Sequence, residues 1–122
     1  MYDQYLFDLD KTLLYGTTAV EGAVAMVRCV PSLRVVTNNN RYAPPTIARR
    51  LQEAGMAIDA SQILSPLTRV EGGAYWVWGT PEAKAYLSER GVATEAQGAP
   101  VLLCYRDDYT HDELAECCAR AA

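Results

Sequence analysis

Short apolar runs alternate with longer amphipathic segments along this chain of 122 residues. The short runs have the length of buried strands, and the segments between them have helical spacing. Alternation of strand and helix favours parallel strand pairing. The sequence therefore predicts an α/β fold, a Rossmann-like layered arrangement with a mainly parallel sheet flanked by helices. The expected strands are Tyr5–Phe7, Leu33–Val36, Ile63–Leu64, Ala74–Trp78 and Val101–Tyr105.

Capping patterns indicate where several helices begin. Thr18–Glu21 and Thr110–Glu113 both match the capping box, in which a hydroxyl and a carboxylate satisfy the free amides of a first turn. Pro31 is expected to end the first of these helices, because proline cannot continue a helix. The expected helices span residues 18–29, 45–54, 80–90 and 110–122, with a weaker one opening at Thr68.

Composition excludes several classes of protein. The formal net charge is -4 and no basic cluster is present, so nonspecific nucleic-acid binding is not expected. No apolar run approaches the length of a membrane span, so no membrane partner is expected either. The four cysteines form no C-x-x-C pair and there is one histidine, which disfavours an ordinary zinc site. Free thiols and the lack of a signal-peptide pattern after Met1 favour the cytoplasm.

Two carboxylates follow the first expected strand. Asp8 and Asp10 are separated by one residue, so they project similarly while the backbone stays extended. Such acids are costly to bury unpaired and call for a cation or for solvent. Mg²⁺ suits oxygen ligands and bridges to phosphate. One carboxylate could then attack phosphorus while the other exchanges a proton, although a plain solvated acid pair is the simpler alternative.

A second polar motif follows the second expected strand. Thr37 ends that strand, and three asparagines come after it. A hydroxyl and turn amides in this position can hold phosphate oxygens, whereas asparagine also occurs in ordinary turns. The carboxyl ends of parallel strands share one edge, where ligands bind in open α/β sheets. Both motifs are therefore expected at the same edge.

Together these motifs resemble a known family. The run FDLDKTLLYG resembles the first motif of the haloacid-dehalogenase (HAD) superfamily, and VVTNNNRYAPPTIARRLQEAGM resembles its second. The asparagine-rich turn is similar to the nitrophenylphosphatase-like branch, which includes phosphoglycolate and pyridoxal-phosphate phosphatases. Residues 77–92 and 101–121 resemble the start of that branch's large cap. The resemblance implies that residues 1–78 form the N-terminal part of the core and that residues 79–122 begin the cap.

The resemblance also implies roles for individual residues. Asp8 would be the nucleophile and a Mg²⁺ ligand, and Asp10 would be the general acid and base with its carbonyl on the metal. Thr37 and the Asn38 backbone would bind the transferring phosphoryl group, while Thr12 would steady the loop. The implied activity is Mg²⁺-dependent hydrolysis of a small phosphorylated metabolite through an aspartyl phosphate.

The sequence departs from the family pattern at one position and in length. Lys11 occupies a place where the family usually has glycine, so a positive φ there would strain the backbone. Its side chain is expected to point either to solvent or to the phosphate. The family's third motif, a lysine, and its fourth, an acidic metal site, both follow the cap in this branch. The sequence is therefore expected to represent the first half of a longer enzyme.

A compact alternative uses residues already present. If the chain closed into a single five-stranded domain, Lys84 could bind phosphate, and Asp107 and Asp108 could complete the metal site. The simpler interpretation makes Lys84 a solvated helix residue and places the two acids in a turn.

Two other functional classes are open at this point. One is a catalytically inactive HAD-like domain that acts by binding or assembly. The other is a phospho-acceptor receiver domain, which is disfavoured because Ser65 and Pro66, and no aspartate, follow the third strand. In a half-core, an exposed sheet edge would recruit partners, so a homo-oligomer is also expected.

Overall fold

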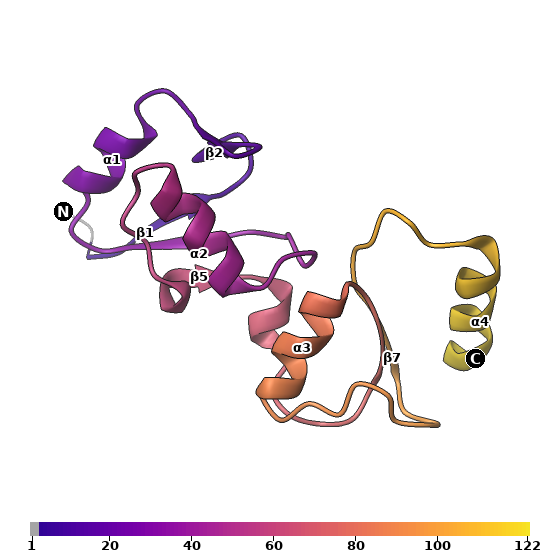
Figure 1. The fold of residues 1–122 in the computed structure, drawn as a ribbon. Helices are drawn as coiled ribbons and strands as arrows, with labels where there is room; N and C mark the ends of the chain where they lie inside the picture. The colour runs from indigo at the N-terminus through magenta and orange to yellow at the C-terminus, as the bar shows by residue number, and fades with distance from the viewer. Residues whose placement is uncertain (1–2) are drawn as a thin grey trace. The chain divides into compact units, whose positions relative to one another are not determined.

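The structure is a computed structural model that describes residues 3–122. The chain divides into two compact units, whose elements are traced in Figure 1. Unit 1 holds the described residues up to Asn38 together with Pro44–Pro66, and unit 2 holds Asn39–Ala43 together with Leu67–Ala122. The predicted division after residue 78 stays a prediction, because compactness alone does not identify a cap domain.

Unit 1 contains a three-stranded parallel sheet in the order β1-β4-β5. Its strands are β1 (Tyr5–Asp8), β4 (Leu33–Val36) and β5 (Ile63–Leu64), and all three match expected strands within a residue. Helix α1 (Ala23–Cys29) lies between β1 and β4 in the chain, and α2 (Pro44–Glu53) lies between β4 and β5. The prediction of an α/β fold with a mainly parallel sheet is confirmed.

One face of this sheet is buried and the other is open. The chain moves in the same direction across the sheet at both crossovers, so right-handed connections place both helices over one face. Accordingly Leu33, Val35 and Ile63 are buried. On the opposite face Leu6 is 64% exposed and Val36 is 40% exposed. Apolar side chains are therefore left uncovered on that side of unit 1.

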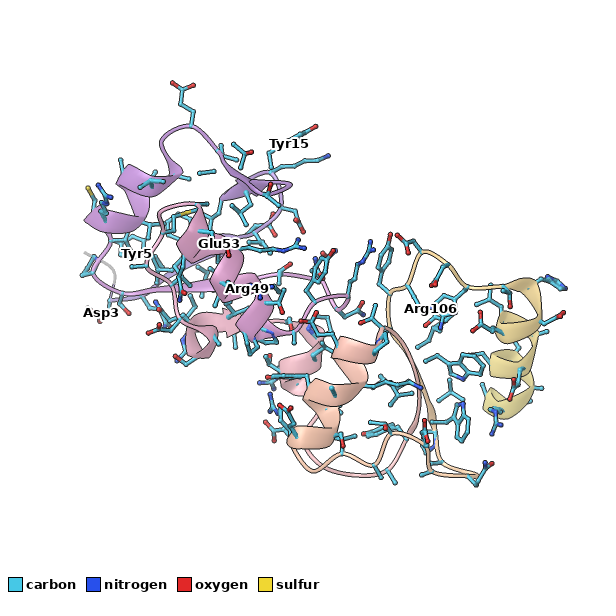
Figure 2. The ribbon with its side chains drawn as sticks, in the orientation of Figure 1. Asp3, Tyr5, Tyr15, Arg49, Glu53 and Arg106 are labelled. Atoms are coloured by element: carbon cyan, nitrogen blue, oxygen red, sulfur yellow. The ribbon has the colours of Figure 1, made fainter. Side chains whose placement is uncertain are left out.

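The helix expected from Thr18 is wrong at its start. Thr18 belongs to β3 (Thr18–Ala19), which pairs antiparallel with β2 (Leu14–Tyr15) in a hairpin. Gly16 makes the turn with φ +64°, and the exposed Tyr15 side chain extends away from the hairpin (Figure 2). Helix α1 begins only at Ala23, and its N-terminus has no side-chain cap. Thr18 of the Thr-x-x-Glu pattern thus pairs in a hairpin strand, and the pattern does not open a helix.

Unit 2 contains a separate pair of parallel strands. Strand β6 (Trp76–Trp78) pairs with β7 (Val101–Leu103), and α3 (Pro81–Glu89) lies between them in the chain. Helix α4 (His111–Ala121) follows β7 and begins with the predicted capping box at Thr110. The core of this unit is built from Leu67, Val77, Ala83, Leu87, Val92 and Cys104.

Two further expectations are wrong. No α-helix opens at Thr68, because the chain there forms a short 3₁₀ turn, η2 (Pro66–Arg69); another 3₁₀ turn, η1 (Ala60–Gln62), precedes β5. Gly72 and Gly73 both take positive φ values, which a helix cannot accommodate. The five-stranded sheet of the compact alternative is also wrong, since among the described residues β6 and β7 form a two-stranded sheet separate from β1-β4-β5.

The helices of the described residues are short. None of them is long and apolar enough to cross a membrane. The four cysteines are all free thiols, with Cys104 and Cys117 buried and Cys29 and Cys118 exposed.

Candidate active site

The two acids after β1 both face solvent. Asp8 is the last residue of β1 and is exposed, and Asp10 two positions later is exposed as well. Leu9 between them is buried at 4% exposure. The alternation of exposed and buried side chains thus continues past the end of the strand, and it turns both carboxylates away from the core.

Thr37 lies at the end of the neighbouring strand. Asp8 pairs in register with Val36, so Thr37 is one residue beyond the strand neighbour of Asp8. The Thr37 amide donates to the Leu64 carbonyl at 2.9 Å, and Thr37 is only 5% exposed. Asn38 follows it and is exposed. The structure therefore brings Asp8, Thr37 and Asn38 to one edge of the unit 1 sheet.

The loop after β1 turns back tightly on itself. The Leu9 carbonyl accepts hydrogen bonds from the Leu13 amide at 2.9 Å and the Leu14 amide at 3.1 Å, and the Lys11 amide donates to the Leu14 carbonyl at 2.7 Å. Lys11 has φ +66°, and it is the one non-glycine residue of the described chain with a positive φ. A left-handed backbone costs an ordinary residue roughly 1–2 kcal/mol. The strain predicted for Lys11 is thus present, and its side chain is exposed.

The carboxylates of this loop have few partners. The Thr12 hydroxyl donates to Asp8 Oδ2 over a long 3.5 Å. Among residues 3–122 neither Asp8 nor Asp10 takes part in an ion pair. Both carboxylates are therefore free to receive a cation or a phosphoryl group.

The oxygen donors at this edge are a partial set for a metal. No group of three or more His, Cys, Asp or Glu side chains within the described residues is arranged to hold an ion. Mg²⁺ is commonly bound through one or two carboxylates, with water and substrate oxygens completing its octahedron. The Asp8 carboxylate and the Asp10 backbone carbonyl offer two hard oxygen ligands that suit this requirement.

The other predicted site residues lie in unit 2 and are paired there. Lys84 Nζ lies 3.8 Å from Glu95 Oε1. Asp107 Oδ2 lies 3.0 Å from a nitrogen of Arg41, and Asp108 pairs with Arg106. Asp8 and Thr37 belong to unit 1. Lys84, Asp107 and Asp108 therefore belong to a different compact unit from Asp8 and Thr37. Their proposed roles at the site stay predictions.

The asparagine triplet has a structural use that the sequence did not reveal. Asn39 Oδ1 accepts hydrogen bonds from the amides of Arg41 at 3.0 Å and Tyr42 at 3.2 Å, which closes a local turn. Asn40 Oδ1 accepts from the Tyr105 amide at 2.7 Å. The turn propensity of asparagine was visible in the sequence, but its partner Tyr105 was not.

Comparison with known proteins identifies the family. The family model described as haloacid dehalogenase-like hydrolase matches residues 5–93, which is more than half of the chain. The chain belongs to the haloacid dehalogenase-like hydrolase family. This confirms the resemblance drawn from the two motifs. No curated protein matches the sequence.

Solved structures of this family share the fold. Glycerol phosphate phosphatase from Mycobacterium tuberculosis, solved with calcium, is 21% identical, with a TM-score of 0.78 over 96% of this chain and 39% of its own. 4-Nitrophenylphosphatase from Thermotoga maritima is 18% identical, with a TM-score of 0.78 over 95% of this chain and 49% of its own. NagD from E. coli is 20% identical, with a TM-score of 0.76 over 93% of this chain and 50% of its own. The chain thus spans half or less of the length of these proteins.

Proposed function

We propose that this chain provides the nucleophile and the phosphate-binding edge of a phosphomonoester hydrolase. The observation that supports this most directly is the placement of Asp8, exposed and without an ion pair in residues 3–122, beside Thr37 at one sheet edge. Membership of the haloacid dehalogenase-like hydrolase family supports the same assignment.

The reaction would take two displacements at phosphorus. A carboxylate oxygen of Asp8 attacks phosphorus as the bond to the leaving oxygen breaks, and Asp10 gives its proton to that oxygen. Water then attacks the aspartyl phosphate and passes a proton to Asp10. The Asp8 carboxylate leaves with the electron pair of its bond to phosphorus, and inorganic phosphate is released.

Thr37 and Asn38 would hold the phosphoryl oxygens during both steps. A hydroxyl and turn amides at the end of a parallel strand are suited to an anion. Lys11, whose side chain is exposed in the same loop as the acids, is a further cation that could reach the phosphate.

Mg²⁺ is the metal that these residues would hold. Asp8 and the Asp10 carbonyl would be its ligands, and the ion would supply charge neutralisation between the nucleophile and the phosphate. The M. tuberculosis glycerol phosphate phosphatase has been solved with magnesium as well as with calcium, and such neighbours support this choice.

The substrate class that fits is a small phosphorylated metabolite. The printed names of the structural neighbours, glycerol phosphate phosphatase and 4-nitrophenylphosphatase, support small phosphate esters. We also propose a reducing compartment such as the cytoplasm, supported by the four free thiols.

Phosphate release from p-nitrophenyl phosphate tests the proposal. The chain is expected to release phosphate when Mg²⁺ is present and to lose that activity when Asp8 is replaced by Asn. Equal rates for the two proteins would remove Asp8 as the nucleophile.

A non-catalytic HAD-like binding or assembly domain is the second candidate. It is favoured by the partial metal-ligand set and by the ion pairs that occupy Lys84, Asp107 and Asp108 in unit 2. Under this alternative the chain binds inorganic phosphate or Mg²⁺ at Asp8 but releases no phosphate from the ester.

We further propose that two copies of the chain associate through unit 1. Strand β1 forms one edge of its sheet, and the exposed Leu6 lies on its uncovered face. Size-exclusion chromatography is expected to give a species larger than 13.4 kDa, and Leu6→Lys should shift it towards the monomer. A wild-type chain that elutes as a monomer at all concentrations would contradict this.

A further inference from the structure

Two polar side chains of the described chain are buried, Thr37 at 5% exposure and Ser65 at 4%. Both belong to unit 1, and each directly follows a strand of its parallel sheet, Thr37 after β4 and Ser65 after β5. Removing a hydroxyl from water costs free energy unless the group gains a hydrogen bond. Two such residues at one sheet edge are therefore a feature that the apolar core does not require.

The strand register makes these two residues neighbours. Val36 of β4 pairs with Leu64 of β5. The next hydrogen bond, from the Thr37 amide to the Leu64 carbonyl at 2.9 Å, continues the ladder, because a residue in a parallel pair bonds to the residues on either side of its partner. Thr37 is thus opposite Ser65, and adjacent strands lie about 4.8 Å apart.

Both side chains lie on the buried face of the sheet. Along β4 and beyond it, Val35 is 0% exposed, Val36 is 40% exposed and Thr37 is buried again. Ile63 and Ser65, two positions apart, are buried in the same way. Successive side chains of a strand point to opposite faces, so Thr37 and Ser65 project side by side from neighbouring strands.

The two residues differ in what they can reach. The Ser65 hydroxyl oxygen is inaccessible to solvent, so it is closed to a phosphate ion as well. Thr37 directly precedes the exposed Asn38 and is one residue beyond the strand neighbour of Asp8. Any effect of the Ser65 hydroxyl on phosphoryl binding must therefore act through Thr37.

We propose that Ser65 is a positioning residue, whose hydroxyl restricts the Thr37 side chain to the rotamer that presents its own hydroxyl to phosphate. The inference rests on the proposed role of Thr37 in phosphoryl binding. The branched Cβ of threonine leaves few rotamers, so one polar neighbour is enough to select among them. A side chain that is already oriented loses less conformational entropy when the substrate binds.

The rotamer of Thr37 tests the ordering without substrate. In the full 122-residue chain, NMR couplings from the Thr37 methyl carbon to its backbone nitrogen and carbonyl carbon measure the populations of χ1. The wild type is expected to show one dominant rotamer, and Ser65→Ala, which removes one oxygen atom, should give averaged couplings. Ser61→Ala makes the same change at an exposed position of η1 in the same unit, so it is the matched control and should keep the wild-type couplings.

Phosphate affinity tests the consequence. Inorganic phosphate is titrated into the protein with Mg²⁺ present, and the Asn38 amide signal is followed by NMR. Ser65→Ala is expected to weaken binding by about three- to tenfold, the range for one hydrogen bond. Thr37→Val keeps the branched shape but removes the group through which Ser65 acts. In that background Ser65→Ala should change the affinity by less than about twofold, whereas a merely structural role would give the full loss in both.

A second substitution separates the hydroxyl from the space it fills. Ser65→Cys fills the site with a thiol, which is only a weak hydrogen-bonding group. The variant is therefore expected to lose Thr37 order and phosphate affinity as Ser65→Ala does. Urea midpoints of both variants show that the protein compared is folded.

Three results would overturn the inference. One is unchanged Thr37 couplings in Ser65→Ala. Another is an equal loss of phosphate affinity with and without the Thr37 hydroxyl. The third is a Ser65→Cys variant that behaves like the wild type, because filled space and not the hydroxyl would then matter. A wild-type protein without phosphate-induced shifts at Asn38 would instead defeat the proposed function, and the couplings would still show whether Ser65 orders Thr37.

Discussion

Two strand–loop junctions of this molecule carry acids, and the acids differ in their partners. After β1, Asp8 and Asp10 are exposed and form no ion pair within residues 3–122. After β7, Asp107 and Asp108 are each paired with an arginine. Aspartates near the end of a parallel strand can thus be left exposed without an ion pair or be tied into the local structure, and the presence of an arginine partner separates the two cases.

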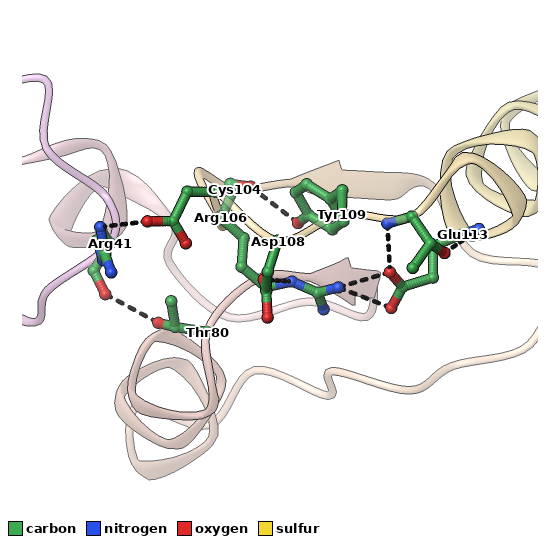
Figure 3. A network of polar contacts seen from close by, with 9 residues as sticks. Arg41, Thr80, Cys104, Arg106, Asp108, Tyr109 and Glu113 are labelled. Carbon is green, nitrogen blue, oxygen red and sulfur yellow. Dashed lines mark hydrogen bonds and ion pairs between the residues drawn. The ribbon is translucent and has the colours of Figure 1, made fainter.

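The two loops also differ in backbone strain and in the number of close side-chain contacts. The loop after β1 contains the strained Lys11 and a long 3.5 Å contact between Thr12 and Asp8. In the loop after β7, one guanidinium nitrogen of Arg106 donates to both carboxylate oxygens of Glu113 in α4 (Figure 3). Strain and sparse contacts at a candidate active site agree with the general tendency of such sites to hold unfavourable geometry, which neighbouring structure maintains.

The largest expected effect on activity comes from replacing one aspartate near each strand end with asparagine and comparing the two variants. Asp8→Asn should lower the rate of p-nitrophenyl phosphate hydrolysis by about 10³-fold or more, because it removes the nucleophile. Asp108→Asn should stay within about threefold of the wild type, since Arg106 keeps its bond to Glu113 and a solvent-exposed pair contributes little. Similar losses in the two variants would break the comparison and revive Asp108 as a metal ligand.

A smaller effect is expected on the stability of unit 2 when Glu113, the partner of Arg106, is protonated in acid. Arg106 lowers the pKa of Glu113, so the pair contributes stability above the ordinary pKa of a glutamate, about 4.3, and loses it as the pH falls through the lowered value. The urea midpoint of unit 2 should therefore fall between about pH 5 and pH 3. Both tryptophans of the chain, Trp76 and Trp78, lie in unit 2, so their fluorescence reports this transition.

Glu113→Gln should flatten that acid dependence, because the amide does not titrate. Glu53→Gln, on an exposed position of α2 in unit 1, is the control and should keep the wild-type slope. An identical slope in Glu113→Gln and wild type would show that the network does not stabilise unit 2.

The smallest expected effect concerns the strained backbone after β1. Lys11→Gly should raise the free energy of unfolding by about 0.5–1 kcal/mol, because glycine adopts φ +66° without steric cost. The greater conformational freedom of glycine in the unfolded chain offsets only part of this gain. Lys84→Gly, within α3, should lower it by about 1 kcal/mol. Urea denaturation followed by circular dichroism measures both, and a loss of stability in Lys11→Gly would mean that its backbone is not strained.

The parts of the fold that were predicted correctly are those that depend on residues close together in the sequence. The strands at Tyr5 and Leu33 and the capping box at Thr110 form as expected, because an apolar run or a cap needs only neighbouring residues. The same reasoning was wrong at Thr18, where pairing with Tyr15 across a glycine turn uses the residues that would have opened a helix. A capping pattern does not show whether a hairpin competes for it.

The candidate site was predictable for a similar reason. Asp8, Asp10 and Thr37 could be found because each directly follows a strand and parallel strands share an edge. The contact of Asn40 with Tyr105 could not be found, since the two residues are 65 positions apart and neither forms part of a recognisable motif. The sequence therefore indicated the groups suited to chemistry and did not reveal hydrogen bonds between residues far apart in the chain.

The path of the chain between the two units has a consequence for folding. Tyr105 and Asp107, which hold Asn40 and Arg41, follow them in the chain by more than sixty residues. Contacts between residues so distant in sequence form slowly, because a long loop must close first. During translation the segment Asn39–Ala43 is thus made before its partners in unit 2, and the contacts of Asn40 and Arg41 can form only after Asp107 has left the ribosome.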